Sequence, residues 1–158
     1  MKELIKLLED NARYTNAELA DILGISEKEV ADKIAKLEKD GVIRGYKALI
    51  DWDQVSDDCV TALIELKVTP QKVGFEEIAE YIMNMEEVES VYLMSGSFDL
   101  TVIVKGRTFK EVALFVSKRL APLDVVTSTA THFVLRRYKD MGVPLVDSNS
   151  DDRGMLWL

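Results

Sequence analysis

The stretch TNAELADILGISEKEVADKIAKLEKDG, residues 15–41, decides the fold of the first part of the chain. It opens with TNAE, residues 15–18, a capping box in which the Thr hydroxyl and the Glu carboxylate satisfy helix-end amides reciprocally. Gly24 ends that helix in the left-handed conformation that glycine tolerates. SEKE, residues 26–29, is a second capping box, and Gly41 ends the helix that it begins. Two helices joined by so short a turn must cross steeply, as in a helix-turn-helix.

The flanking segments extend this pattern. An apolar stripe predicts a first helix from about Lys2 to Asn11. The segment Val42–Ala48 is short and strand-like, with Arg44 and Lys47 facing outward, and it resembles a wing placed to touch sugar and phosphate. The alternative is a plain three-helix bundle without a ligand. The tight turn and the wing favour a winged helix-turn-helix that binds double-stranded DNA.

The net charge argues against nucleic acid. The chain of 158 residues has a formal charge of −8. Residues 1–51 carry 9 Lys and Arg against 11 Asp and Glu, and residues 52–158 carry 11 against 17. DNA-binding domains are usually basic, because neutralised phosphates supply much of their affinity. The prediction of DNA binding therefore rests on the pattern of helices and turns.

Other function classes leave little trace in the sequence. Cys59 is the single cysteine and His132 the single histidine, so a metal site or a His-based acid–base pair is hard to build. No phosphate-binding loop, nucleophile elbow or dinucleotide fingerprint occurs. No apolar run is long enough for a membrane helix, and no signal peptide is evident. We expect a cytoplasmic protein with no membrane contact, no metal, no cofactor and no catalytic residues.

The hydrophobic period changes from helical to alternating after residue 59, which predicts a second domain. The predicted order is strand, helix, strand, strand, helix, strand, a ferredoxin-like βαββαβ sandwich, so the chain is α+β. The predicted elements are strands 60–68, 88–94, 98–105 and 124–138, with helices 75–85 and from Thr108 to Pro122. The predicted domains are a DNA-binding domain 1–51, a linker 52–59, an effector-binding and oligomerisation domain 60–140, and a tail 141–158.

Two surfaces of this second domain bear on function. Tyr92, Met94, Thr101 and Ile103 alternate against the inward residues and leave a partly apolar outer sheet face, which favours pairing of two sheets in a homodimer. The tail is acidic and ends with Met155-Leu156-Trp157-Leu158, an apolar segment that we expect to dock on this protomer or on a neighbour.

The sequence resembles the Lrp/AsnC family, the leucine- and asparagine-responsive regulators of bacteria and archaea. NARYTNAELADILGISEKEV and KIAKLEKDGVIRGYKALIDW carry the resemblance, and LEKDGVIRGY, residues 37–46, is its most telling part. It extends to about Asp140 and implies dimers that pair through their sheets and assemble into higher oligomers such as octamers. It also implies a small effector, typically an amino acid, bound between dimers.

The family's glycine–x–x–aspartate turn matches Gly96-Ser97-Phe98-Asp99. Gly96 permits a left-handed turn, and turn amides can hold a carboxylate. Asp99 either accepts from a ligand ammonium or caps the turn. The candidate effector-binding residues are Ser95, Gly96, Ser97, Phe98, Asp99, Thr129 and Thr131, of which the two threonines are equally explained as strand formers.

The recognition helix departs from the family pattern. Its exposed face usually carries Arg, Ser and Thr, whereas here Asp32 stands where the resemblance implies a base. A carboxylate that faces phosphate lowers affinity, although it can accept from cytosine N4. The candidate DNA-contacting residues are Ser26, Lys28, Glu29, Asp32, Lys33, Lys36, Arg44 and Lys47.

Three functions follow from these features. The first is a sequence-specific DNA-binding transcriptional regulator that responds to an amino acid, with individually weak DNA contacts that assembly reinforces. The second is an oligomeric amino-acid sensor with weak or lost DNA binding. The third is an enzyme, since some Lrp-like proteins are sirohaem decarboxylases with histidines near the substrate, and the single His132 disfavours it.

Overall fold

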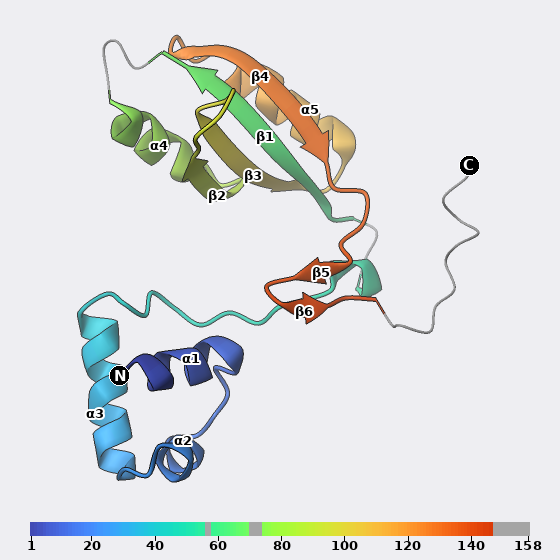
Figure 1. The fold of residues 1–158 in the computed structure, drawn as a ribbon. Helices are drawn as coiled ribbons and strands as arrows, with labels where there is room; N and C mark the ends of the chain where they lie inside the picture. The colour runs from blue at the N-terminus through green and yellow to red at the C-terminus, as the bar shows by residue number, and fades with distance from the viewer. Residues whose placement is uncertain (56–57, 70–73, 147–158) are drawn as a thin grey trace. The chain divides into compact units, whose positions relative to one another are not determined.

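The computed structural model describes residues 1–55, 58–69 and 74–146. The chain divides into two compact units, Met1–Ala48 and Leu49–Leu158 (Figure 1). The predicted docking of the apolar segment 155–158 lies outside the described residues. In the part of the chain that is described, no helix is both long and apolar enough to cross a membrane.

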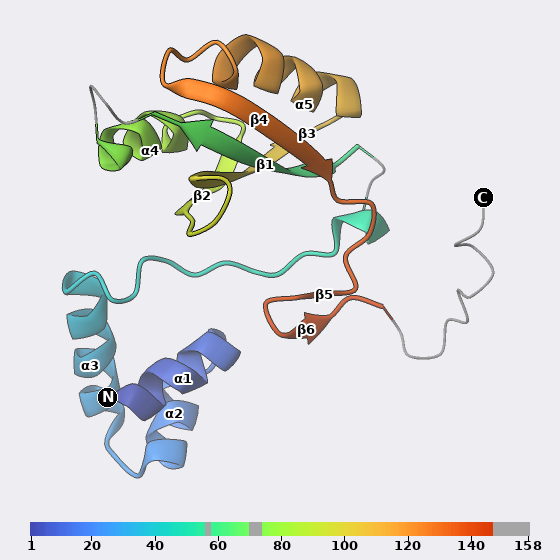
Figure 2. The same cartoon turned by 45° about the horizontal axis from the view of Figure 1, so that its top comes forward.

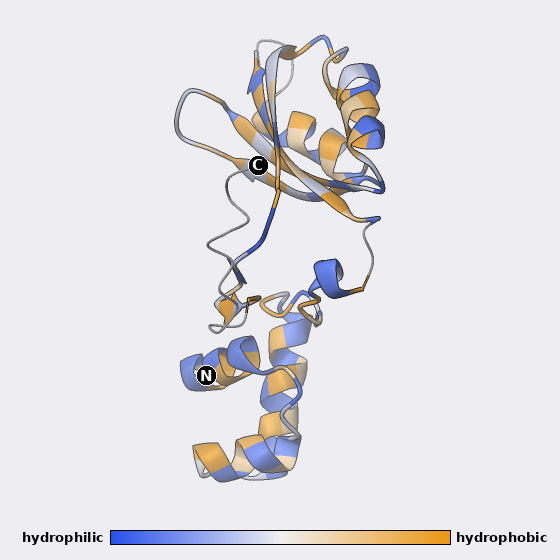
Figure 3. Ribbon diagram, turned by 90° about the vertical axis from the view of Figure 1, so that its right-hand side faces the viewer, coloured by the Kyte–Doolittle hydropathy of each residue, from blue (hydrophilic) through white to orange (hydrophobic). Residues whose placement is uncertain are grey.

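The first unit consists of three helices, α1 (Lys2–Asp10), α2 (Asn16–Leu23) and α3 (Glu27–Lys39). Figure 3 shows hydrophobic and hydrophilic residues alternating along these helices, as expected for amphipathic segments that bury one side. The buried sides meet in one small core of Leu4, Leu19, Ala20, Val30 and Leu37.

The two predicted capping boxes differ in the structure. The box at α2 is complete: the Thr15 hydroxyl accepts from the Glu18 amide at 3.2 Å, and the Thr15 amide donates to Glu18 Oε2 at 2.8 Å. Gly24 follows with φ +65°, which confirms the predicted stop. At α3 only half of the box forms. The Ser26 hydroxyl accepts from the Glu29 amide at 3.2 Å, but the Glu29 carboxylate pairs with Lys33 one turn further along the helix.

The second unit is the predicted βαββαβ sandwich, preceded by a short 3₁₀ helix, η1 (Trp52–Gln54). Its strands form one antiparallel sheet in the order β2-β3-β1-β4, with α4 and α5 packed against it (Figure 2). The elements are β1 (Val60–Val68), α4 (Phe75–Met83), β2 (Val88–Leu93), β3 (Leu100–Gly106), α5 (Phe109–Phe115), a π-helical continuation η2 (Val116–Leu120) and β4 (Val126–Phe133).

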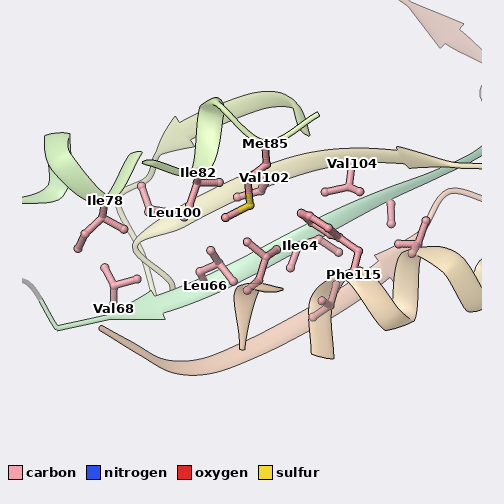
Figure 4. Close-up of a cluster of buried hydrophobic side chains, with 14 of the residues drawn as sticks. Ile64, Leu66, Val68, Ile78, Ile82, Met85, Leu100, Val102, Val104 and Phe115 are labelled. Carbon is pink, nitrogen blue, oxygen red and sulfur yellow. The ribbon is translucent and has the colours of Figure 1, made fainter. Parts of the chain in front are cut away.

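The alternation predicted for β1 is confirmed. Every second residue of β1 is buried: Val60, Ala62, Ile64, Leu66 and Val68. Figure 4 shows several of them packed with side chains from α4 and α5. Because Ile78 and Ile82 of α4 share this core with Phe115 of α5, both helices cover the same face of the sheet.

The predicted long strand 124–138 is wrong at its C-terminal end. β4 ends at Phe133, and its last contact with β1 is the Val134 amide donating to the Thr61 carbonyl at 2.9 Å. Since β1 begins at Val60, residues after Val134 have no strand beside them to extend the ladder. They lead into a short hairpin, β5 (Lys139–Asp140) and β6 (Val143–Pro144).

The other face of the sheet is not covered by α4 or α5. The register places Tyr92, Thr101, Glu65 and Ala130 in one row across the four strands. Tyr92 and Met94 are exposed, as predicted for this outer face. Thr101 also lies on it but is buried, because its strand is flanked by β2 and β1 on both sides.

Candidate DNA-binding and effector sites

Helix α3 presents most of the candidate DNA-contacting residues. Val30 and Leu37 are buried and fix the inward side of the helix. Lys28, Glu29 and Asp32 are exposed on the rest of its surface. The hydroxyl of Ser26 is occupied as the N-cap, so this residue orders the start of the helix rather than standing free for a base.

The cations of α3 are partly neutralised by the helix itself. Lys33 pairs with Glu29, and Lys36 Nζ lies 2.7 Å from Asp40 Oδ2. Both are contacts across one helical turn, where ion pairs are weak and easily exchanged for another partner. Lys28 has no ion-pair partner among the residues that the structure describes. DNA phosphate must therefore compete with carboxylates for two of the four lysines of α3.

The wing predicted at Val42–Ala48 does not form a strand. The amides of Val42 and Ile43 both donate to the Leu37 carbonyl, at 2.9 and 3.1 Å, and so continue the helix end. The following residues are extended, but the described part of the first unit contains no strand that could pair with them. Arg44 and Lys47 are exposed on this segment, as expected for side chains that reach phosphate.

Tyr46 ties the extended segment to α3. Its hydroxyl donates to Glu38 Oε1 at 3.0 Å. Burial raises the pKa of Tyr46, and the hydrogen bond to the charged Glu38 raises it further. The contact therefore anchors to α3 the segment that carries Arg44 and Lys47, without any strand pairing.

The Ser95–Asp99 turn joins β2 to β3. It is closed by the Met94 amide, which donates to the Asp99 carbonyl at 2.8 Å. Gly96 has φ +151°, a conformation that other residues rarely adopt. Ser95, Gly96 and Ser97 are exposed, so their backbone is accessible to a ligand, while Phe98 is half-buried.

Asp99 is held by the neighbouring strand. Its Oδ2 accepts from the Val68 amide at 2.9 Å, and its Oδ1 lies 3.3 Å from Lys67 Nζ. The hydrogen bond from Val68 lowers the pKa of Asp99, and Lys67 lowers it further against the opposing effect of burial. Asp99 thus caps the end of β1, and an ammonium ligand would have to compete with Lys67 for it.

The two candidate threonines lie on β4 at different distances from this turn. Thr129 is opposite Leu66, whose carbonyl accepts from the Asp99 amide at 2.9 Å, so Thr129 and Asp99 flank the same residue of β1. Thr131 is opposite Ile64, one pair further from the turn. Because Leu66 and Ile64 are buried against the helices, both threonines lie on the helix-covered face.

Lys67 is a further residue of this site that the sequence did not indicate. It reaches Asp99 with its side chain and accepts from the Thr127 hydroxyl with its carbonyl at 3.2 Å. No local signal identifies it, since the contact joins residues 32 positions apart. Only the register of β1 beside β3 brings them together.

His132 lies on the outer sheet face, where its Nε2 is 3.0 Å from Glu65 Oε2. Cys59 is a half-buried free cysteine. Among the described residues, no group of three His, Cys, Asp or Glu side chains is arranged to hold a metal ion.

Comparison with known proteins agrees with this two-part description. The family described as winged helix-turn-helix DNA-binding matches residues 1–44, and the Lrp/AsnC ligand binding domain matches residues 61–144. The HTH-type transcriptional regulator YugG of Bacillus subtilis is 46% identical over 153 residues, which cover 96% of this chain and 92% of that protein. The chain belongs to the Lrp/AsnC family.

Other members of the Lrp/AsnC family are similar over most of their length. LrpA of Pyrococcus abyssi is 30% identical, with 87% of this chain and 96% of that protein covered. The transcriptional regulator NMB0573 of Neisseria meningitidis, solved as a complex with L-Met, has a TM-score of 0.72 at 25% identity, covering 90% of this chain and 92% of that one. This Lrp/AsnC chain is therefore a helix-turn-helix transcriptional regulator with a ligand-binding domain after its DNA-binding domain.

Proposed function

We propose that the chain is a cytoplasmic regulator that binds double-stranded DNA through α3 and the segment after Gly41, under the control of an amino acid bound at the Ser95–Asp99 turn. The observation that carries the DNA-binding part is the exposed side of α3, which begins at a capped N-terminus and follows a tight turn. In a helix-turn-helix this second helix enters the major groove with its N-terminal residues against the bases.

The geometry of the turn supports an amino acid as effector. The exposed backbone around Gly96 offers amide donors for a carboxylate. Asp99 offers an anionic acceptor for an ammonium, once Lys67 is displaced from it. The complex of the Neisseria meningitidis relative with L-Met supports the same ligand class.

The outer sheet face supports assembly through pairs of sheets. Tyr92, Met94 and Ile103 give this face an apolar part that α4 and α5 leave uncovered. A second copy packed on it forms a two-fold dimer, and dimers that join further give an oligomer such as an octamer. Such an assembly presents several α3 helices to one DNA molecule and raises the overall affinity.

A second function is supported by a specific observation. The pairs Lys33–Glu29 and Lys36–Asp40 occupy two of the four lysines of α3. An oligomeric amino-acid sensor with weak or lost DNA binding would have such a helix.

Isothermal titration of the full chain with a panel of amino acids separates the two functions. The proposed regulator binds an amino acid with different affinity when DNA from upstream of its own coding sequence is present, because effector and DNA are coupled. A sensor module binds the same amino acid with one affinity in both titrations. If none of the amino acids gives a heat of binding, the effector part of the proposal is contradicted.

A further inference from the structure

The second unit contains a cavity away from the turn just described. It has a volume of about 220 Å³ and lies between α5 with its π-helical continuation η2 and the C-terminal end of β3. Leu114 and Phe115 line its apolar part, above the buried side chains of Val104 and Val112. The volume is below the ~300–1,000 Å³ of sites for drug-sized ligands, so it suits a smaller molecule.

The local packing shapes this cavity. Gly106 ends β3 beneath α5, where a Cβ would lie 2.7 Å from Val112 Cγ2. Glycine therefore lets the helix approach the strand closely at one end of the cavity. At the other end the helix widens into the π turn Val116–Leu120, a rare feature that is frequent at functional sites. This turn carries Lys118 and Arg119 to the cavity wall.

The charged groups around the cavity leave one cation without a partner. Arg119 Nη1 contacts both carboxylate oxygens of Glu87 at 2.7 Å, and Lys105 Nζ lies 2.6 Å from Glu89. Lys118 has no hydrogen bond or ion pair among the residues that the structure describes. An apolar cavity with an unpaired ammonium at its wall is complementary to an anion with an apolar body.

We infer that this cavity binds a small aliphatic carboxylate, with its chain against Leu114 and Phe115 and its carboxylate at Lys118. The site is separate from the Ser95–Asp99 turn, because the two lie at opposite ends of β3. Six residue steps of ~3.3 Å separate Leu100 from Gly106, a distance of about 20 Å. The inference goes beyond the proposed effector site and requires neither that site nor DNA binding.

Two sources supply this ligand chemistry, an aliphatic α-amino acid and the 2-oxo acid with the same side chain. Glu111 distinguishes them. Its Oε2 accepts from the Arg107 amide at 2.7 Å, which leaves the other oxygen of this carboxylate for a ligand ammonium. The amino acid gains this contact, whereas the 2-oxo acid brings only its carboxylate and its chain.

Methyl NMR of the full chain tests the site, with L-leucine and 4-methyl-2-oxopentanoate as the two ligands. We expect shifts at the methyl groups of Val104, Val112 and Leu114 with at least one of them. Lys118→Gln should weaken the affinity read from these methyls by about tenfold, as expected for loss of a charge-assisted hydrogen bond. Lys110→Gln removes a cation from the same helix outside the cavity and should leave the affinity unchanged.

Three results would overturn the inference: no shift with either ligand, shifts confined to Leu93 and Leu100 near the turn, or equal effects of Lys118→Gln and Lys110→Gln. Shifts confined to the turn would leave the proposed effector site standing. If the full chain does not bind DNA, as measured separately by fluorescence anisotropy, the proposed function is contradicted. The inference about this cavity is then still open to the NMR test.

Discussion

The carboxylate of Asp99 accepts a hydrogen bond from the backbone amide of Val68 at 2.9 Å. The contact fixes the Ser95–Asp99 turn to the end of β1, where Lys67 supplies a second donor. The aspartate of the family's glycine–x–x–aspartate turn is thus already a structural residue before any effector binds. Its charge is part of what holds the two strands in register at this end of the sheet.

Asp99→Asn should lower the thermal unfolding midpoint at neutral pH, because a neutral amide is a weaker acceptor for Val68 and Lys67 than a carboxylate. The pKa of Asp99 is lowered in the folded chain, so its contribution is present above the ordinary pKa of an aspartate and is lost as the pH falls below it. The difference in midpoint between wild type and variant should shrink below about pH 4. A difference that stays constant down to pH 2 would contradict this role of the charge.

Glu29→Gln should strengthen DNA binding, because it releases Lys33 and removes a negative charge from α3. The expected gain is about two- to fivefold at low salt, the range for a surface ion pair worth up to about 1 kcal/mol. Fluorescence anisotropy with a labelled duplex measures it. Glu76→Gln on α4 changes the net charge equally in the other unit and should have no effect. A gain of the same size in Glu76→Gln would assign the effect to total charge rather than to α3.

Gly106→Ala should destabilise the chain by about 1–3 kcal/mol, since the added methyl overlaps the Val112 side chain. Val112→Ala alone also destabilises, because Val112 is buried. The double variant Gly106→Ala with Val112→Ala should lose less stability than the sum of the two, because each change makes room for the other. Urea unfolding of the three variants measures this coupling, and strict additivity would show that the two residues do not pack together.

Tyr92→Lys should dissociate the assembly, because it places a charge on the outer sheet face proposed to pair with a second copy. Tyr81→Lys is the matched control, since Tyr81 is also exposed but lies on α4. Sedimentation velocity distinguishes the species. An unchanged oligomer in Tyr92→Lys, or dissociation in both variants, would contradict pairing through the sheets.

Local signals predicted most of the fold. The Thr15 capping box, the Gly24 stop and the alternation of β1 each depend on residues close in sequence, and the structure confirms all three. Errors arose where the outcome depends on a distant partner. β4 ends at Phe133 because β1 begins at Val60, and the wing residues lack a neighbouring strand in the described part of their unit.

The candidate sites follow the same rule. The exposed position of Asp32 and Arg44 could be predicted from periodicity. The pairing of Lys36 with Asp40 also follows a local rule, since residues four apart on a helix are neighbours. The contact of Lys67 with Asp99 depends on strand register and has no local signal.

We propose that α3 of this chain binds DNA under the control of a small effector. Anisotropy of a duplex from upstream of its own coding sequence, recorded from about 50 to 200 mM salt with and without a bound amino acid, tests it most directly. We expect an affinity that falls steeply with salt, a salt slope reduced by about 2 in the double variant Lys33→Ala with Lys36→Ala, and a different affinity when the amino acid is present. Binding that is absent at 50 mM salt, or that ignores both salt and amino acid, would contradict it.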